Sequence, residues 1–251
     1  MLSAVVITNN AKDTIGACID ALLKVASDIV IVDSGSNDGT REICETKPVR
    51  YFQKEWEGYS ANKNYGNAIA IHPYILSIDS DEILSHELIR SINTEFSGTN
   101  KLAEAYSLRF VTNFNGKWIK YGSWNPEWHI RIFDKRLIQW ELMDVHEALN
   151  LQPNHHLKRL NGLVLHFSYP SVESHLKKIE KYTDLFAERN FKAGKKATII
   201  HTLFSPIFTF FSSYVLKLGF LDGAEGWVIA KNNALYTQKK YSKLVSKWKN
   251  A

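Results

Sequence analysis

Residues 74–84 read YILSIDSDEIL, an apolar, strand-like run that ends in the carboxylates Asp79, Asp81 and Glu82. Like charges this close repel, and a carboxylate taken out of water is costly unless a positive charge compensates it. The stretch is therefore either a solvated turn or the holder of a cation. Mg²⁺ and Mn²⁺ suit carboxylate oxygens, and they accept water and phosphate as further ligands.

The strand at 74–79 is the fourth in a regular alternation of strands and helices. Apolar strands are expected at 4–8, 28–33 and 49–54, and helices at 13–26, 40–46 and 60–71. Near-continuous apolar strands that alternate with helices indicate a parallel sheet covered on both faces. Such sheets bind ligands at the carboxyl ends of their strands. Asp33 and Asp79 each close a strand, so we expect both at that edge.

The pattern changes after residue 84. A helix is expected at 85–96, residues 105–168 are rich in strands and aromatic side chains, and residues 171–193 return to helix. The expected fold class is α/β, a mostly parallel sheet with flanking helices, followed by a helical, basic C-terminal extension.

Charge is distributed unevenly along the chain. Residues 1–150 carry 15 Lys and Arg against 20 Asp and Glu, a net charge of −5, whereas residues 151–251 carry 16 against 6, a net charge of +10. The basic half favours an anionic partner such as a membrane surface or a phosphorylated substrate. Nucleic acid is the weaker alternative, because no recognised binding motif accompanies the charge.

Residues 199–221 are apolar enough to suggest a transmembrane helix, but His201, Pro206 and Lys217 interrupt the run. We expect instead a helix that begins at Ser205-Pro206, ends near Gly219 and lies in the plane of a membrane interface. An ordinary core helix is the alternative. The downstream lysines favour the membrane: Lys231, Lys239, Lys240, Lys243, Lys247 and Lys249. Two cysteines without metal-ligand spacing, and a strand pattern that begins at Ala4, favour the cytoplasm.

Four stretches occur in the order in which one enzyme family carries its nucleotide-sugar motifs: TNNAKDTIGACIDAL, VDSGSNDGT, the Lys63-Asn64 pair in SANKNYGNAIA, and ILSIDSDE. The chain thus resembles family 2 glycosyltransferases of the GT-A fold over about residues 3–85. Most of the remaining chain resembles the branch of this family that acts in lipopolysaccharide or lipooligosaccharide core biosynthesis, of the glucosyltransferase type. The stretches that carry this resemblance are YGSWNPEWHIRIFDKR, VHEAL, HFSYPSVESHLKKIEKY and SYVLKLGFLDGAEGWVIA.

The resemblance implies an inverting reaction, in which an acceptor hydroxyl displaces a nucleoside diphosphate from the anomeric carbon. Mg²⁺ or Mn²⁺ would be bound by Asp81, with Asp79 beside it. Contacts to the nucleotide sugar would come from the strand ends and the third helix: Thr8, Asn9, Asp33, Ser34, Gly35, Lys63, Asn64, Asp79 and Ser80.

The resemblance also implies a general base and an acceptor site. The Glu-Asp pair that many relatives use as base is absent, and MDVHEAL (143–149) occupies the matching region. We assign the base to Glu147, with His146 beside it and Asp144 as the alternative. The acceptor would be bordered by aromatic and basic residues of one segment: Trp124, Trp128, His129 and Arg131.

We therefore predict a glycosyltransferase domain at residues 1–168, with a nucleotide-sugar half at about 1–100 and an acceptor half at about 101–168, and a membrane-associating extension at 169–251. It would move a hexose, glucose from UDP-glucose, to a lipid-linked inner-core acceptor on the cytoplasmic face of the bacterial inner membrane, with no nucleic-acid partner. The alternatives are a glycosyltransferase for another cell-surface glycan, a nucleotidyltransferase, and a non-catalytic sugar- or membrane-binding module. Thr8-Asn9-Asn10 disfavours a nucleotidyltransferase, because it lacks a glycine-rich, basic loop.

Overall fold

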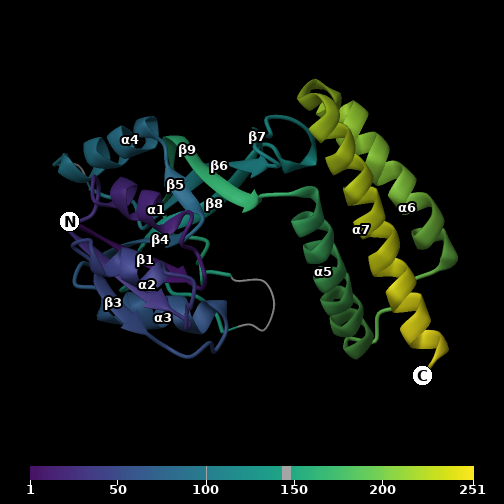
Figure 1. Ribbon diagram of the computed structural model, residues 1–251, viewed down its shortest axis with the longest axis horizontal. Helices are drawn as coiled ribbons and strands as arrows, with labels where there is room; N and C mark the ends of the chain where they lie inside the picture. Colours follow the sequence, from purple (N-terminus) through teal and green to yellow (C-terminus); the bar gives the residue numbers. More distant parts are fainter. Residues whose placement is uncertain (100, 143–147) are drawn as a thin grey trace. The chain divides into compact units, whose positions relative to one another are not determined.

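The computed structural model describes residues 1–99, 101–142 and 148–251. In these residues one sheet of nine strands runs in the order β3-β2-β1-β4-β8-β6-β9-β5, with β7 paired to β6 (Figure 1). The predicted α/β fold class with a helical C-terminal region is confirmed. The sheet is mixed, however, because only its first four strands in this order are parallel.

The parallel part contains β1 (Leu2–Thr8), β2 (Asp28–Asp33), β3 (Arg50–Gln53) and β4 (Tyr74–Asp79). The connecting helices are α1 (Ile15–Leu22), α2 (Thr40–Glu45) and α3 (Tyr59–Ile69). Thr8 lies opposite Asp33, and Ile7 lies opposite Asp79, in the strand register. The carboxyl ends of β1, β2 and β4 therefore meet at one edge of the sheet.

The antiparallel part begins directly after β4. Its elements are β5 (Glu82–Leu84), α4 (His86–Ser97), β6 (Ala105–Phe114), β7 (Lys117–Trp118), a 3-10 turn (Gly122–Trp124), β8 (Glu127–Asp134) and β9 (Leu157–Tyr169). Only Ser80 and Asp81 separate β4 from β5, and β5 pairs with β9 so that Glu82 lies opposite His166. This register brings a histidine 84 positions away to the carboxylate cluster.

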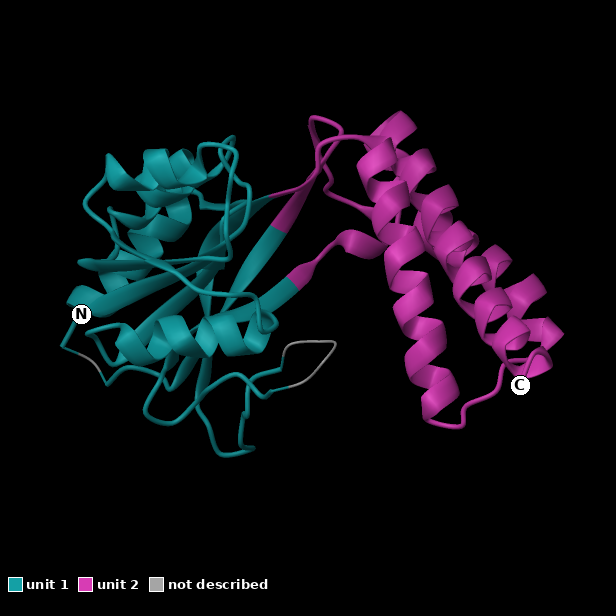
Figure 2. Cartoon of the chain, turned by 60° about the horizontal axis from the view of Figure 1, so that its bottom comes forward, with its two compact units in different colours: residues 1–110, 128–166 teal, residues 111–127, 167–251 magenta. Residues whose placement is uncertain are grey.

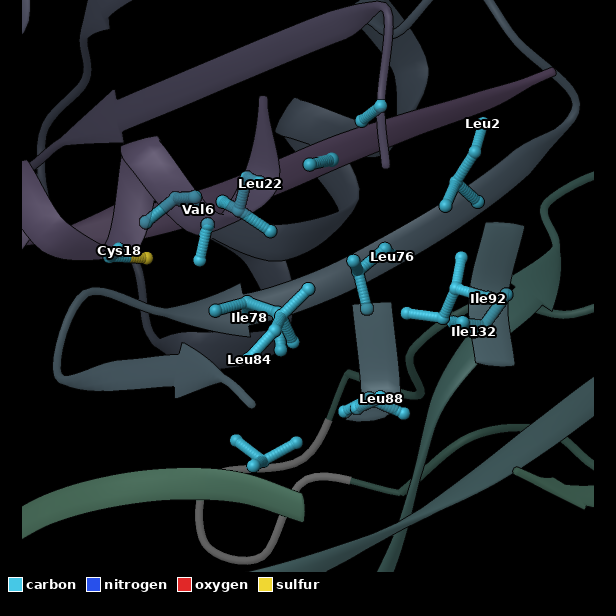
Figure 3. Close-up of a cluster of buried hydrophobic side chains, with 14 of the residues drawn as sticks. Leu2, Val6, Cys18, Leu22, Leu76, Ile78, Leu84, Leu88, Ile92 and Ile132 are labelled. Carbon is cyan, nitrogen blue, oxygen red and sulfur yellow. The ribbon is translucent and has the colours of Figure 1, made fainter. Parts of the chain in front are cut away.

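Hydrophobic residues fill both faces of the parallel strands. Val6 belongs to a cluster with side chains of α1 and α4 (Figure 3), whereas its neighbour Val5 belongs to a second cluster on the opposite face. Successive side chains of a strand point to opposite faces, so a strand buried on both sides needs apolar residues at nearly every position. This explains the continuous apolar runs that predicted the fold.

The chain divides into two compact units, residues 1–110 with 128–166 and residues 111–127 with 167–251 (Figure 2). The second unit contains α5 (Val172–Lys192), α6 (Ile199–Phe211), a π-helical turn (Ser212–Leu216), a 3-10 turn (Gly219–Asp222) and α7 (Gly223–Lys249). The buried Asp222 carboxylate accepts hydrogen bonds from the backbone N–H groups of Lys120 and Tyr121, which attach the 111–127 segment to this unit. The functional division predicted at residue 168 stays a prediction.

Helix α6 begins earlier than the sequence pattern suggested. Its N-cap is Thr198, whose backbone N–H donates to His201 Nδ1 at 3.2 Å and whose hydroxyl lies 2.8 Å from the same atom. Pro206 lies inside the helix. The start predicted at Ser205-Pro206 is therefore wrong, because the Thr198–His201 contacts satisfy the end of the helix about two turns further upstream.

The packing of α3 against the sheet gives a first prediction. A Cβ atom added at Gly66 would lie 2.4 Å from Val5 Cγ1 and 3.1 Å from Val32 Cγ2, both in the core. Gly66→Ala should lower the free energy of unfolding by about 1–3 kcal/mol, because the stiff valines cannot move away. Urea unfolding followed by tryptophan fluorescence measures this.

Gly16→Ala in α1 is the matched control, since its nearest neighbours would be at 3.6 Å and 3.9 Å. It should be neutral or stabilising by up to about 1 kcal/mol. Equal unfolding midpoints for the two variants would show that α3 does not approach β1 this closely.

Candidate active site

The turn after β2 is organised by the Asp33 carboxylate. Asp33 is completely buried, and its Oδ1 accepts hydrogen bonds from the backbone N–H groups of Gly35 and Ser36 at 2.9 Å and 2.8 Å. Its Oδ2 accepts from the Tyr51 hydroxyl at 2.7 Å. Gly35 has a φ of +91°, which favours glycine. Asp33 thus fixes the turn, and its predicted contact with a nucleotide base stays a prediction.

Ser34 connects this turn to its neighbours. Its backbone N–H donates to the Thr8 carbonyl at 3.0 Å, and its carbonyl accepts from Asn9 Nδ2 at 3.1 Å. Its hydroxyl accepts from Nδ2 of the buried Asn62 at 3.1 Å. Thr8, Asn9, Asp33 and Ser34 therefore lie together, as the parallel sheet predicted.

Four charged side chains form a mostly buried network at the carboxyl end of β4. Lys63 Nζ, from α3, lies 3.0 Å from Asp79 Oδ1 and is only 1% exposed. Arg131 Nη2, from β8, lies 2.6 Å from Glu82 Oε1 and 3.4 Å from Asp79 Oδ2. The backbone N–H of Asp79 donates to Glu82 Oε2 at 3.0 Å. Two cations, one from α3 and one from β8, thus balance two carboxylates.

The two carboxylates respond differently to this environment. Burial opposes the ionisation of Asp79, but the charges of Lys63 and Arg131 outweigh it and hold its pKa below the usual range. Burial raises the pKa of Glu82, and the neighbouring charge of Asp79 adds to that effect although Arg131 opposes it. The network therefore favours the ionised form of Asp79 over that of Glu82.

Asp81 points to a different partner. Its Oδ2 lies 3.5 Å from Nε2 of His166, and 36% of its side chain is exposed. Burial lowers the pKa of His166, but the hydrogen bond with Asp81 and the charges of the three acidic residues raise it above its usual value. Asp81 is thus accessible to a ligand, whereas the oxygens of Asp79 already face two cations.

The donor set fits a hard divalent ion only if a substrate completes it. Within the described ranges, no group of three His, Cys, Asp or Glu side chains is placed to hold a metal ion. Asp81 and His166 would supply an oxygen and a nitrogen, and Mg²⁺ or Mn²⁺ commonly take the rest from water and phosphate. Metal binding by Asp81 and Asp79 stays a prediction.

A pocket of about 400 Å³ adjoins this network. Its lining combines charged, aromatic and aliphatic side chains: Lys63, Asp79, Trp128, His129, Ile130, Arg131, Trp140, Leu149 and Leu151. Three of the residues predicted for the acceptor, Trp128, His129 and Arg131, lie here. Arg131, however, is largely buried and engaged with Glu82 and Asp79, so its charge supports the carboxylates.

The fourth predicted acceptor residue, Trp124, lies in the second unit. Its ring stacks on Tyr169 with centroids 5.2 Å apart and meets His175 edge to face at 5.3 Å. Burial lowers the pKa of His175 to about 4, so this imidazole is a neutral member of an aromatic cluster. A contact between Trp124 and an acceptor stays a prediction.

Trp140 is a pocket residue that sequence reasoning missed. The Asn64 side chain holds its backbone, accepting from Trp140 N–H at 3.1 Å and donating to its carbonyl at 2.8 Å. Lys63 Nζ lies 4.9 Å from the centre of its indole ring. Asn64, predicted to contact the nucleotide, is thus used to position Trp140, and nucleotide contact stays a prediction. No local motif around Trp140 signals this role.

Asp144, His146 and Glu147, predicted to supply the base, lie outside the described residues. The residues that flank them are placed, since Trp140 pairs with Leu149 and Glu141 N–H donates to the Ala148 carbonyl at 2.8 Å. Trp140 and Leu149 both line the pocket.

Comparison with known proteins identifies relatives of this architecture. The family model described as Glycosyl transferase family 2 matches residues 3–152. The lipopolysaccharide core biosynthesis glycosyltransferase LpsC of Rhizobium meliloti is 27% identical over 246 residues, which cover 94% of this chain and 88% of that relative. An uncharacterized glycosyltransferase of Rickettsia typhi is 25% identical over 90% of this chain and 80% of its own length.

Among solved structures, residues 1–349 of S. aureus TarS give a TM-score of 0.48 at 14% identity. The match covers 99% of this chain and 91% of that chain. This likeness is remote, so the family match carries the relationship.

The buried network gives a second prediction. Arg131→Met should lower the free energy of unfolding by about 3–5 kcal/mol, because removing one partner leaves a buried carboxylate uncompensated. Glu82→Gln combined with Arg131→Met should be less destabilising than the sum of the two single changes, since the charge that Arg131 balances is then gone. Urea unfolding of the wild type, the two single variants and the double variant measures both effects.

Arg41→Met is the control, because Arg41 and Glu45 form an exposed pair on α2, with half of each side chain in solvent. Its effect should stay within about 0.5 kcal/mol. If Arg131→Met proved equally mild, Arg131 would be a ligand-facing residue and not a support for the carboxylates.

Proposed function

Because the chain belongs to glycosyl transferase family 2, we propose that it transfers a hexose from a nucleoside diphosphate sugar to a lipopolysaccharide core acceptor, with inversion at the anomeric carbon. The observation that carries the proposal is the Asp79-Ser80-Asp81 turn at the carboxyl end of β4. The two carboxylates are 30% and 36% exposed, and they differ in their partners: Asp79 is paired with Lys63 and Arg131, whereas Asp81 lies beside His166. The similarity to LpsC along nearly the whole chain supports a core acceptor.

Different residues of the site would bind the metal, the nucleotide and the sugars. Asp81, with Asp79 and His166 beside it, would hold Mg²⁺ or Mn²⁺, which neutralises the leaving diphosphate when bound. The turn fixed by Asp33 would receive the nucleotide, and Lys63, paired with Asp79, would lie over the nucleotide. Indole faces suit the CH surfaces of sugars, so Trp128 and Trp140 would orient the hexose and the acceptor.

The transfer itself breaks one bond and forms one. The acceptor oxygen bonds to the anomeric carbon as the bond from that carbon to the diphosphate breaks, and Glu147 takes the acceptor proton. Glucose from UDP-glucose is the proposed donor. A glycosyltransferase acting on another surface glycan would keep the same site and differ only in the acceptor pocket.

We also propose that the second unit binds the cytoplasmic face of the inner membrane through α6. One helix in the described residues, Ile199–Leu216, is long and apolar enough to cross a membrane, and only 6% of it is buried within the chain. Its exposed apolar side chains include Ile199, Ile200, Leu203, Phe204, Ile207, Phe208, Phe211, Val215 and Leu216. The other side packs on α7, where Phe210 meets Trp227 with centroids 5.1 Å apart. An interfacial helix requires an apolar face that is exposed to the membrane, and this helix has one, while its other face is covered by α7.

The lysines of α7 support this proposal less than their number suggested. Lys239 pairs with Glu180, Lys243 with Asp184 at 2.7 Å, and Lys247 with Glu188, all on α5. Their charge is used to join two helices of the unit. The membrane proposal therefore depends mainly on the apolar face of α6.

A third prediction separates binding from catalysis. UDP with Mn²⁺ should raise the melting temperature of the wild type, since a ligand at a hundredfold excess over its Kd adds about 2.7 kcal/mol to the folded state. Asp81→Asn should lose the manganese-dependent part of this shift together with transfer. Glu147→Gln should keep the shift and lose transfer of labelled glucose from UDP-glucose to core oligosaccharide by about 10²–10⁴-fold.

Asp13→Asn and Glu141→Gln, both changes of exposed carboxylates, serve as controls and should retain binding and transfer. Absence of any shift in the wild type would contradict the proposed function. Retained turnover in Glu147→Gln would exclude it as the base and leave Asp144 as the alternative.

A fourth prediction concerns the membrane. Replacing Phe204, Ile207 and Phe208 by serine should reduce the fraction of protein that sediments with phospholipid vesicles at least tenfold, because each exposed side chain loses about 1.5–3 kcal/mol of apolar burial. The three are 63%, 67% and 66% exposed, so their replacement should leave the melting temperature nearly unchanged.

Ile71→Ser with Leu137→Ser is the matched control, because these side chains of the first unit are 67% and 52% exposed. That variant should sediment like the wild type. Equal loss in both variants would mean that general surface hydrophobicity, and not α6, causes the binding.

A further inference from the structure

An exposed arginine stacks on a tryptophan of the pocket. The guanidinium carbon of Arg159, on β9, lies 4.7 Å from the centre of the Trp128 ring, on β8. The preceding residue, Lys158, pairs with Glu95 of α4 at 2.6 Å. Because neighbouring side chains of a strand point to opposite faces, Arg159 extends away from α4 and toward the face that carries Trp128. Trp128 lines the pocket next to Asp79.

Arg159 differs electrostatically from the other cations near this pocket. Lys63 and Arg131 are buried, and they lie within 3.0 Å of Asp79 and 2.6 Å of Glu82, respectively. Arg159 is exposed, and no carboxylate in the described part of the chain forms an ion pair with it. The charge of Arg159 is therefore available to an anionic group that enters with the ligand.

The two side chains have complementary chemistry. A guanidinium group binds phosphate or carboxylate through two parallel hydrogen bonds, and stacking on an indole leaves the N–H groups at its edge accessible. The indole ring in turn offers an apolar surface to the CH groups of a sugar. A neutral sugar would use only the ring, whereas a charged sugar would use both.

We propose that Arg159 and Trp128 form a subsite for an anionic sugar unit of the acceptor, one that carries a phosphate or a carboxylate group. This assignment rests on the proposed function, since it takes the pocket as the acceptor site. The subsite makes Arg159 a specificity-determining residue: it selects an acceptor by a charge next to the sugar ring.

Binding of small probes tests the subsite directly. The chain has seven tryptophans, and the indole N–H signal of Trp128 in a two-dimensional NMR spectrum is the one missing from Trp128→Phe. Glucose 6-phosphate, glucuronate and glucose are titrated into the full chain without divalent metal. At least one of the two anions should shift the Trp128 signal with an affinity about tenfold higher than glucose, as expected for one charge-assisted contact.

Arg159→Gln should abolish the preference for the anion, and Arg159→Lys should keep part of it. Arg90→Gln, an exposed arginine of α4, removes the same charge elsewhere and should change nothing. A response to glucose 6-phosphate alone assigns the charge to phosphate, and a response to glucuronate alone assigns it to carboxylate. Three outcomes would overturn the proposal. Glucose could bind as tightly as both anions, neither anion could give a saturable shift, or the preference for the anion could be unchanged in Arg159→Gln.

The thermal shift with UDP and Mn²⁺ is recorded on the same variants. Arg159→Gln should retain it, because the variant leaves the Asp81 turn intact. If UDP and Mn²⁺ did not raise the melting temperature of the wild type, the proposed function would be contradicted, and the anion titration could still be interpreted. An intact shift with no anion preference would contradict only the subsite.

Discussion

The candidate site depends on the charge balance between Lys63, Asp79, Arg131 and Glu82. Four charges in a small, mostly buried volume are tolerable only because each carboxylate has a cation within ion-pair distance. The partners come from α3, β4, β5 and β8, so the network also joins the parallel and antiparallel parts of the sheet. Because Asp79 is already paired with two cations, Asp81 is the carboxylate of the turn that these cations leave for a ligand.

Much of the fold could be predicted from the sequence because its signals are local. The apolar runs of β1, β2 and β4 are long enough to be recognised, and their shared edge follows from the parallel arrangement alone. The wrong start of α6 also comes from reliance on a local signal. Ser205-Pro206 is a common local signal for a helix start, but the Thr198–His201 contacts fix the end, and the proline is accommodated inside the helix.

The partners within the site could be predicted only in part, because they come from distant positions. Residues at strand ends, such as Thr8 and Asp33, were placed correctly by topology. Nothing near Arg131 indicates that it serves Glu82, 49 residues away, and the proximity of His166 to Asp81 depends on the β5–β9 register. Trp140 is held by Asn64 over 76 residues. Such contacts are decided by packing, not by a motif.

The roles of the positive charges likewise depend on packing and cannot be read from local motifs. A count of lysines and arginines gives the C-terminal part of the chain its basic character, yet Lys239, Lys243 and Lys247 are paired with acids of α5. At the pocket, Arg131 is paired with Glu82 and Asp79, and its predicted contact with an acceptor stays a prediction. Arg159, which no motif marks, is exposed and stacked on Trp128. Net charge therefore predicts attraction at long range, whereas recognition at contact depends on which cations still lack a carboxylate.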